Sequence, residues 1–252
     1  MRLPSPYSAS LVVLPAMLIA MFVGDSLEAQ VSRSRDAVLP SASAEHYLDR
    51  GRKLMDKGLY AGAIRSLSPA LKKRPDLAEA YLLRGSAYDK IGMPDKAIQD
   101  LTRYIQEKPS DAVGYIRRGD AKNFNSQHRE AIDDYTAAIR LAPSSVSAYM
   151  GRGLAHAGME NYEDAIKDYY WVLRLDPKNR EALGNMGIAC MLADRPIQAV
   201  GYFEQALAVE TDPGWRRRIN ELMETIVRHP GEKKSPEQGP TRGPVRRPRP
   251  MW

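Results

Sequence analysis

The chain has little cysteine, and it has no cluster of side chains suited to holding a metal. Cys190 is the only cysteine in 252 residues, so neither an intrachain disulfide nor a zinc site of the thiolate type can form. Its apolar, helical surroundings favour an inert buried thiol over one that pairs between chains. The histidines lack the short spacings of metal ligands; they are His46, His128, His156 and His229. We therefore expect no metal and no cofactor.

No grouping typical of catalysis stands out. The Gly-Xaa-Gly sequence at 151–153 has no preceding strand pattern, so it does not indicate a dinucleotide loop. The acidic pair Asp133 and Asp134 lies in a polar helical pattern, as expected for solvated side chains. We predict that the protein is not an enzyme and that it has no catalytic residues.

An apolar stretch long enough to span a membrane is not found near the amino terminus. Residues 11–23 form an apolar run interrupted by Pro15, and a transmembrane helix needs about 20 residues. With Arg2 before it and Ala29 at a plausible cleavage point, the run is typical of a signal peptide. We expect residues 1–29 to be a signal peptide and the protein to be exported, periplasmic or secreted. An uncleaved amino-terminal membrane anchor is the alternative.

Positive charge is modest and uneven. The formal net charge is +6, and residues 229–252 contribute +4 of it through six basic residues against two acidic ones. The remainder is nearly neutral, which argues against a nucleic-acid-binding body. The tail 229–252 is rich in Pro and Gly, and we predict that it is disordered. A solubilising role is one interpretation; contact with an anionic surface or a proline-reading domain is the other.

What the sequence does contain is a period of 34 residues. After a polar linker at 30–43, prolines recur at 75, 109, 143 and 177. Glycines recur with the same spacing from Gly51 to Gly187, and alanines from Ala63 to Ala199. The period divides the chain into five units, at 44–77, 78–111, 112–145, 146–179 and 180–213. Such a period indicates stacked supersecondary units that bury an apolar face only against their neighbours.

Each unit has the pattern of two helices joined by a turn. In the second unit, Tyr81, Gly85 and Tyr88 recur at helical spacing and predict a first helix. The sequence 91–94, Ile-Gly-Met-Pro, breaks it, and a second apolar series runs to Pro109. After the fifth unit, apolar residues again fall at helical spacing, so we predict a capping helix at 214–228.

These residues resemble those of the tetratricopeptide repeat (TPR) family. The resemblance is carried by the glycines, alanines and prolines and by an aromatic early in the first helix, as at Tyr47, Tyr81, Tyr115 and Tyr149. It implies an all-α fold, an α-solenoid of about five TPR repeats closed by the capping helix. It also implies a concave surface, lined by the first helices, that binds a protein or peptide partner.

By register, the resemblance places thirteen residues on that groove, although some of them could equally be core. They are Leu82, Ser86, Asp89, Val113, Ile116, Arg117, Asp120, Asn123, Phe124, Ser147, Met150, Leu154 and Ile188. Chaperone-binding TPR domains hold a partner's terminal carboxylate with a lysine–asparagine clamp. Of the corresponding positions here only Arg117 keeps the charge, so we do not expect that role.

Arginines also recur at this period, at Arg50, Arg84, Arg118 and Arg152. They could line a groove for acidic ligands. However, three of them are followed sixteen residues later by aspartate, and the fifth repeat lacks both partners. We therefore predict structural ion pairs within repeats, with the alternative of a solvent-open ladder. The predicted pairs are Arg84 with Asp100, Arg118 with Asp134, and Arg152 with Asp168.

Together these features favour a non-enzymatic scaffold that binds a protein or peptide in its concave groove, outside the cytoplasm. The alternative is a regulatory adaptor subunit of an envelope enzyme complex, recruited through the basic tail. A nucleic-acid binder conflicts with export and with arginine–aspartate pairing. We expect no nucleic-acid partner and membrane contact only through the amino-terminal segment or the tail; the oligomeric state stays open.

Overall fold

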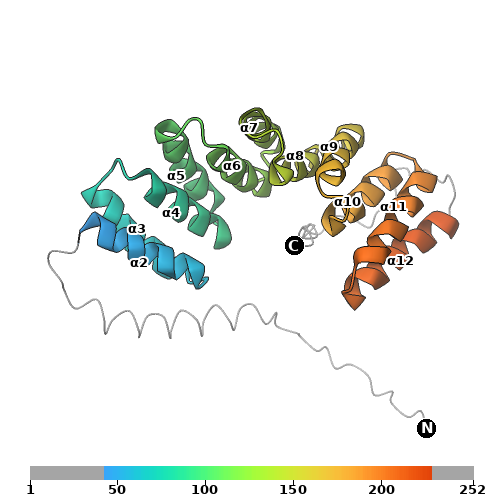
Figure 1. Ribbon diagram of the computed structural model, residues 1–252, viewed down its shortest axis with the longest axis horizontal. Coiled ribbons are helices and arrows are strands. Elements are labelled where there is room, and N and C mark those ends of the chain that lie inside the picture. Colours follow the sequence, from blue (N-terminus) through green and yellow to red (C-terminus); the bar gives the residue numbers. More distant parts are fainter. Residues whose placement is uncertain (1–42, 229–252) are drawn as a thin grey trace, which may run out of the picture. The chain divides into compact units, whose positions relative to one another are not determined.

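The computed structural model describes residues 43–228, and all regular structure in this range is helical (Figure 1). The predicted signal peptide, most of the linker and the predicted disordered tail lie outside the described residues. The described chain forms two compact units divided between Lys108 and Pro109.

Unit 1 consists of two helical hairpins. The first pairs α2 (Ala44–Asp56) with α3 (Tyr60–Lys73), and the second pairs α4 (Ala78–Lys90) with α5 (Pro94–Glu107). α3 also packs against α4, so the hairpins share a core. Its buried centre includes Leu48, Ala63, Leu67 and Ala87.

Unit 2 contains three hairpins and a final helix. The hairpins are α6 (Ala112–Phe124) with α7 (His128–Leu141), α8 (Val146–Gly158) with α9 (Tyr162–Leu175), and α10 (Arg180–Leu192) with α11 (Pro196–Val209). The last helix, α12 (Pro213–Arg228), packs on α11. Both α8 and α10 also contact the helix that precedes them, which joins the hairpins into one stack.

The helix boundaries follow from local chemistry that repeats with the period. Every first helix except α4 begins after a side chain that accepts a backbone N–H, and these caps are Ser43, Asp111, Ser145 and Asn179. Second helices have no such cap. Two of them, α5 and α11, begin with proline, whose missing N–H costs nothing at a first helical position.

The turn inside every hairpin passes through a left-handed residue. In unit 1 this residue is glycine, Gly58 with φ 70° and Gly92 with φ 76°. In unit 2 the same repeat position holds Ser126, Glu160 and Asp194, with φ between 61° and 63°. A side chain is strained in this region, so the turns of unit 2 keep their shape against an unfavourable backbone energy.

Close packing inside each hairpin depends on the glycine of the first helix. A β-carbon built on Gly51 would lie 2.5 Å from Leu67, and one on Gly187 would lie 2.5 Å from Phe203. No real β-carbon approaches a neighbour so closely. The large apolar residue of the second helix therefore occupies the space that glycine leaves open, which explains why the two series share one period.

α12 closes unit 2 with its apolar side. Ile219 is buried, and Trp215, Leu222, Met223 and Ile226 pack on the same core cluster as α10 and α11. The buried carboxylate of Glu210 fixes the turn before it by accepting N–H bonds from Thr211 and Asp212. The helix occupies Pro213–Arg228, the region where apolar spacing predicts a cap.

Candidate functional site

The arginine and aspartate series meet inside the hairpins. Arg84 donates to both carboxylate oxygens of Asp100, with Nε–Oδ2 2.7 Å and Nη2–Oδ1 2.8 Å. Arg118 with Asp134 and Arg152 with Asp168 repeat this two-point geometry at 2.6–2.9 Å. The aspartates are buried, including Asp134, whose helical pattern predicts a solvated side chain. The hydrogen bonds that Arg84 and Arg152 donate to Asp100 and Asp168 raise the pKa of both arginines. These arginines neutralise buried carboxylates, so they do not form a ladder open to anionic ligands.

The same guanidinium groups also reach the preceding repeat. Arg84 donates from Nη1 to the Ser68 hydroxyl at 3.2 Å, and Arg152 donates to Thr136 at 3.1 Å. One arginine therefore fixes the second helices of two successive repeats. The planar fork of arginine can serve both partners at once, which the ammonium group of lysine cannot do in the same geometry.

The fifth repeat shows what replaces this network. Met186 stands in the arginine position and is buried, and Tyr202 stands in the aspartate position. Tyr170 of the preceding repeat takes the place of Ser68 and Thr136. All three polar partners are thus exchanged together for less polar side chains, which avoids leaving a buried charge without its partner.

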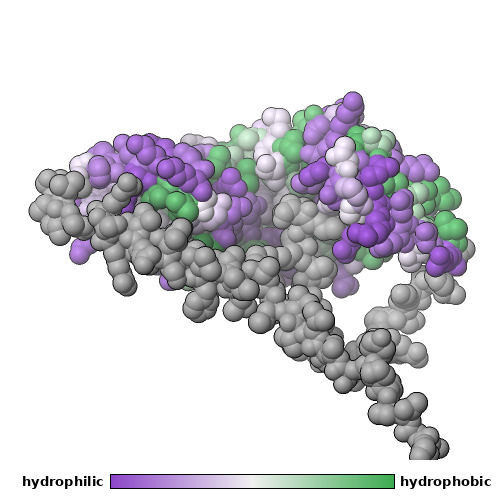
Figure 2. All heavy atoms as spheres, turned by 90° about the horizontal axis from the view of Figure 1, so that it is seen from below, coloured by the Kyte–Doolittle hydropathy of each residue, from purple (hydrophilic) through white to green (hydrophobic). Residues whose placement is uncertain are grey.

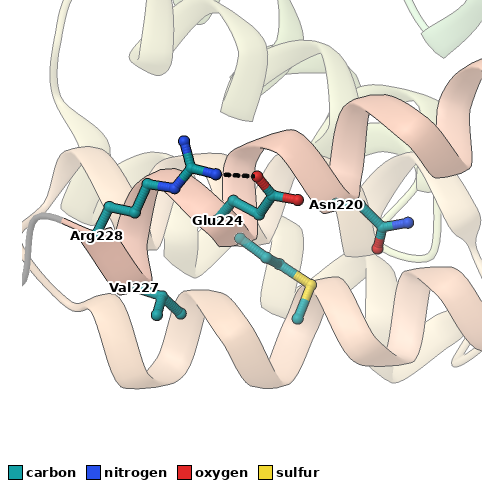
Figure 3. Close-up of a pocket in the computed structure, with 5 residues that line it drawn as sticks. Asn220, Glu224, Val227 and Arg228 are labelled. Atoms are coloured by element: carbon teal, nitrogen blue, oxygen red, sulfur yellow. Dashed lines mark hydrogen bonds and ion pairs between the residues drawn. The ribbon is translucent and has the colours of Figure 1, made fainter.

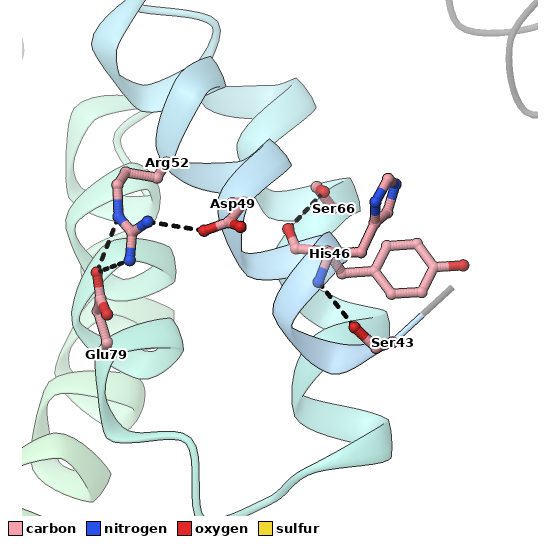
Figure 4. Close-up of polar contacts among 7 residues, drawn as sticks. Ser43, His46, Asp49, Arg52, Ser66 and Glu79 are labelled. Atoms are coloured by element: carbon pink, nitrogen blue, oxygen red, sulfur yellow. Dashed lines mark hydrogen bonds and ion pairs between the residues drawn. The ribbon is translucent and has the colours of Figure 1, made fainter. Parts of the chain in front are cut away.

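The exposed side of the first helices in unit 1 is polar (Figure 4). Arg52 bonds Glu79 at 2.7 Å and Asp49 at 2.8 Å, so α2 and α4 are linked by exposed ion pairs. Ser66 donates to the backbone oxygen of Tyr47 at 2.9 Å, in the position where later repeats have aspartate. The predicted groove residues of this unit, Leu82, Ser86 and Asp89, lie on α4 and are half-buried.

The corresponding side of unit 2 is more apolar, and we call it the first-helix face. Phe124 is 63% exposed and Val113 is 44% exposed, both on α6. Ile116 on α6, Leu154 on α8 and Ile188 on α10 are half-buried, and Ser147 on α8 is exposed. The first-helix face is made by residues Val113, Ile116, Phe124, Ser147, Leu154, Ile188 and Leu192.

One predicted groove residue belongs to the core. Met150 is only 9% exposed and lies in the core cluster of unit 2. The amide of Asn185 on α10 approaches its sulfur at 3.8 Å, so the neighbouring helix covers a position that spacing alone would leave open. Met150 therefore contributes packing and little surface.

The polar residues of the predicted set have partners on the same side of unit 2. Arg117 pairs with Asp120 at 3.7 Å, and the Tyr135 hydroxyl donates to Asp120 at 2.9 Å. Asn123 contacts His128 Nδ1 through its side-chain oxygen at 2.7 Å. These contacts fix the side chains at the edge of the apolar residues.

The sequence-based set omits two large side chains of unit 2, Leu192 on α10 and Trp215 on α12. Leu192 is 50% exposed and occupies the same repeat position as Phe124, so extending the register by one repeat identifies it. Trp215 on α12 packs against Gly184, with a ring atom 3.3 Å from where a β-carbon would lie. Repeat spacing could not place Trp215, because α12 is outside the repeats.

His156 on α8 is half-buried, with its Nδ1 atom shielded from solvent. Its Nδ1 atom has no hydrogen-bond partner, and burial lowers the pKa of the ring. Asp164 and Asp168 on α9 oppose that shift, and Arg152 and Lys167 act in its direction. Cys190, at the equivalent position one repeat later, is 1% exposed, and burial raises the pKa of its thiol. Both groups behave as packed side chains of the hairpin core.

Cavities are shallow in the part of the chain that the structure describes. A depression of about 390 Å³ lies on α12, beside the Arg228–Glu224 ion pair of 3.0 Å (Figure 3). Another of about 290 Å³ lies at the start of α9 and is lined by Glu160, Asn161, Tyr162, Glu163, Asp164 and Ala193. Within residues 43–228 no three His, Cys, Asp or Glu side chains come together to hold a metal ion. In the same range no helix has both the length and the apolar character to cross a membrane.

Comparison with known proteins agrees with this architecture. Tetratricopeptide repeat models match residues 48–112 and 146–179. A crystal structure of MamA protein is 31% identical to this chain, with a TM-score of 0.61, and the match covers 66% of this chain and 91% of that one. The chain is a tetratricopeptide repeat protein. None of the curated proteins matched the sequence.

Other solved TPR proteins share the fold at lower identity. A second MamA crystal structure is 29% identical with a TM-score of 0.59, covering 68% of this chain and 96% of that chain. YrrB, described as a TPR protein with an unusual peptide-binding site, is 16% identical with a TM-score of 0.60, covering 77% of this chain and 97% of its own. At that identity the likeness to YrrB shows the fold alone.

Proposed function

We propose that this TPR protein is a non-enzymatic scaffold that binds a peptide segment of a protein partner on the first-helix face of unit 2. The observation that carries the proposal is Phe124, a large apolar side chain at the end of α6 that is 63% exposed; Val113, at the start of the same helix, is 44% exposed. Exposed apolar residues gathered on one face mark interaction surfaces more often than scattered ones do. The family and the fold are those of interaction scaffolds.

The contrast between the units supports this choice of face. The first helices of unit 1 expose an ion-paired surface around Arg52. Those of unit 2 expose Phe124, Val113 and Leu192. An extended or helical peptide with apolar side chains would cover these residues. Each Å² of apolar surface removed from water would contribute about 25 cal/mol of favourable binding free energy.

The mechanism is a preformed surface. Hairpin glycines, buried ion pairs and helix caps hold the first helices in place before any partner arrives, so little ordering cost falls on binding. The half-buried Ile116, Leu154 and Ile188 already pack against the core or its edge. Only the partner segment needs to become ordered.

Capture experiments with matched variants test this proposal. Full-length protein would be used to pull partners from a lysate of its native host, comparing wild type with Phe124→Ala and Ile116→Glu. The control is Ile197→Glu on α11, which changes a residue that is 88% exposed away from the first-helix face. We expect both face variants to lose partners that wild type and the control retain. Undiminished capture by both face variants would show that the surface is wrongly assigned.

We also propose that the protein acts outside the cytoplasm, periplasmic or secreted. The support is the apolar run at 11–23 followed by Ala29. Amino-terminal sequencing of the protein recovered from host fractions tests this. A mature chain beginning near Gln30 in the exported fraction supports export with cleavage; an intact Met1 in the cytosol contradicts it.

A further inference from the structure

A cluster of aromatic side chains on unit 2 has no part in the first-helix face. Tyr149 on α8 stacks on Trp171 of α9 with ring centroids 6.0 Å apart and planes at 20°. Tyr170 meets Trp171 edge-on at 6.4 Å. Tyr170 and Trp171 are each 48% exposed. We call Tyr149, Tyr170 and Trp171 the aromatic cluster.

The other repeats act as internal controls for these residues. The position of Trp171 holds Pro69, Arg103, Ala137 and Gln205 elsewhere, so the hairpin does not need a tryptophan there. One turn further along α9, Leu175 is 41% exposed, where unit 1 has Lys73 and Glu107. Half-exposed tryptophan beside an exposed leucine is a costly surface unless something covers it.

The chain itself contains a segment rich in proline and arginine, two residue types that bind aromatic rings. Residues 240–250 include Pro244, Pro248 and Pro250 among four arginines. Prolines pack on aromatic faces in the recognition of polyproline II segments, and guanidinium groups stack on tryptophan and tyrosine. In a polyproline II helix, residues three apart share a face about 9 Å apart. Pro244, Arg247 and Pro250 have that spacing.

The length of chain after α12 is sufficient to bring this segment to the cluster. α9 packs on α10, α10 on α11, and α11 on α12. Three such steps amount to about 30 Å at usual helix spacings. The eleven residues 229–239 can extend to about 36 Å. α12 ends at Arg228, within the same unit as the cluster.

We infer that the proline- and arginine-rich segment 240–250 of this chain docks on the aromatic cluster formed by Tyr149, Tyr170 and Trp171. The segment covers the exposed faces of Trp171 and Tyr170 and presents its remaining arginines to solvent. This inference does not depend on the proposed function of the first-helix face, because the two surfaces share no residue.

A nitroxide placed in the segment tests the inference on the full chain. In Val245→Cys the new thiol is labelled, while Cys190 is buried and stays unlabelled. The indole N–H signals of the three tryptophans are then recorded in a ¹⁵N-labelled sample, with Trp171→Phe to assign them. Trp252 lies near the label in sequence and serves as the positive control. Trp215, which packs against Gly184, is the internal reference.

We expect the label to more than halve the Trp171 signal and to spare Trp215. Replacing Pro244, Arg247 and Pro250 by serine in the labelled chain should restore the Trp171 signal. Equal signals for Trp171 and Trp215, with or without those replacements, would overturn the inference. So would loss of the Trp171 signal only when ¹⁵N chains are mixed with separate nitroxide-labelled chains, since the occupant would then be a second copy.

Discussion

Each of the buried aspartates Asp100, Asp134 and Asp168 is neutralised by an arginine, and Asp134 is also met by Lys122 at 2.7 Å. Each arginine–aspartate pair should be sensitive to loss of one partner. Replacing Asp168 by Ala leaves Arg152 half-buried with its main acceptor gone. We expect a loss of about 3 kcal/mol in the free energy of unfolding, near the lower end for a broken buried pair, as measured by urea denaturation. Asp164→Ala is the control, because its pair with Lys167 is exposed and should contribute little.

The fifth repeat supplies a rescue for this prediction. Arg152→Met combined with Asp168→Tyr introduces the residues found at Met186 and Tyr202. We expect the double variant to be more stable than Asp168→Ala, because no unpaired buried charge remains. A double variant less stable than the single one would contradict the explanation by charge balance.

Relief of backbone strain at the turns of unit 2 should stabilise the protein. Glu160 has φ 63°, where a β-carbon is unfavourable. Glu160→Gly should raise the free energy of unfolding by about 0.5 kcal/mol, since relief of strain exceeds the added entropy of the unfolded chain. Met159→Gly, next to it at φ −95°, should be destabilising. Thermal unfolding of both variants measures the contrast, and stabilisation by both would refute the role of φ.

The lowered pKa of His156 predicts that the stability of the protein depends on pH. Burial lowers the pKa of His156 below the ordinary 6.5 in the folded state, so the unfolded chain binds the proton more readily. The contribution to stability is therefore full above about pH 7 and is lost as pH falls through 6.5 toward the lowered value. His156→Tyr, which copies Tyr88 of repeat 2, should flatten the dependence between pH 7 and 5.

Urea midpoints across this range provide the measurement. His46→Tyr is the matched control, because it makes the same substitution at an exposed histidine. Identical slopes for wild type and His156→Tyr would show that another group is responsible.

At the scale of elements, α12 stabilises the end of unit 2 through a few apolar contacts. Ile219 is 2% exposed, and Ile219→Ala should cost about 3 kcal/mol, within the range for deleting a buried aliphatic side chain. Val227→Ala on the same helix changes a residue that is 74% exposed and should have little effect. Urea denaturation followed by tryptophan fluorescence measures both. Equal stability of the two variants would mean that α12 does not cap the core.

The contacts inside the hairpins explain why the repeats can be predicted from the sequence. Gly51 and Leu67 are separated by sixteen residues and touch in space, and the same separation recurs in each repeat. Arg84 and Asp100 also lie sixteen residues apart, and the fifth repeat lacks both equivalents, which indicates a contact between them from sequence alone. Comparison among repeats thus substitutes for comparison among proteins. For Met150 the register left open a place in the groove or in the core; it lies in the core, where Asn185 of the neighbouring α10 approaches it.

At the scale of the whole molecule, the core clusters lie within the two units. Leu67 is fully buried in unit 1, and Phe203 is 1% exposed in unit 2. Leu67→Ala should reduce amide protection mainly in α2–α5, and Phe203→Ala mainly in α6–α12, since each repeat depends on its direct neighbours. Native-state hydrogen exchange measures this. A uniform loss of protection in either variant would contradict the division at Lys108.

The helical hairpin, its period and its internal ion pairs follow from the amino-acid pattern, because these depend on residues a fixed distance apart along the chain. The assignment of partner-binding residues stays a prediction, and export and the tail rest on segments outside the described range. The division into two units, the burial of Met150 and the stacking of Tyr149 on Trp171 arise from the three-dimensional packing of the helices. Each of these depends on how separate helices pack, and packing depends on three-dimensional contacts that a repeating pattern does not encode.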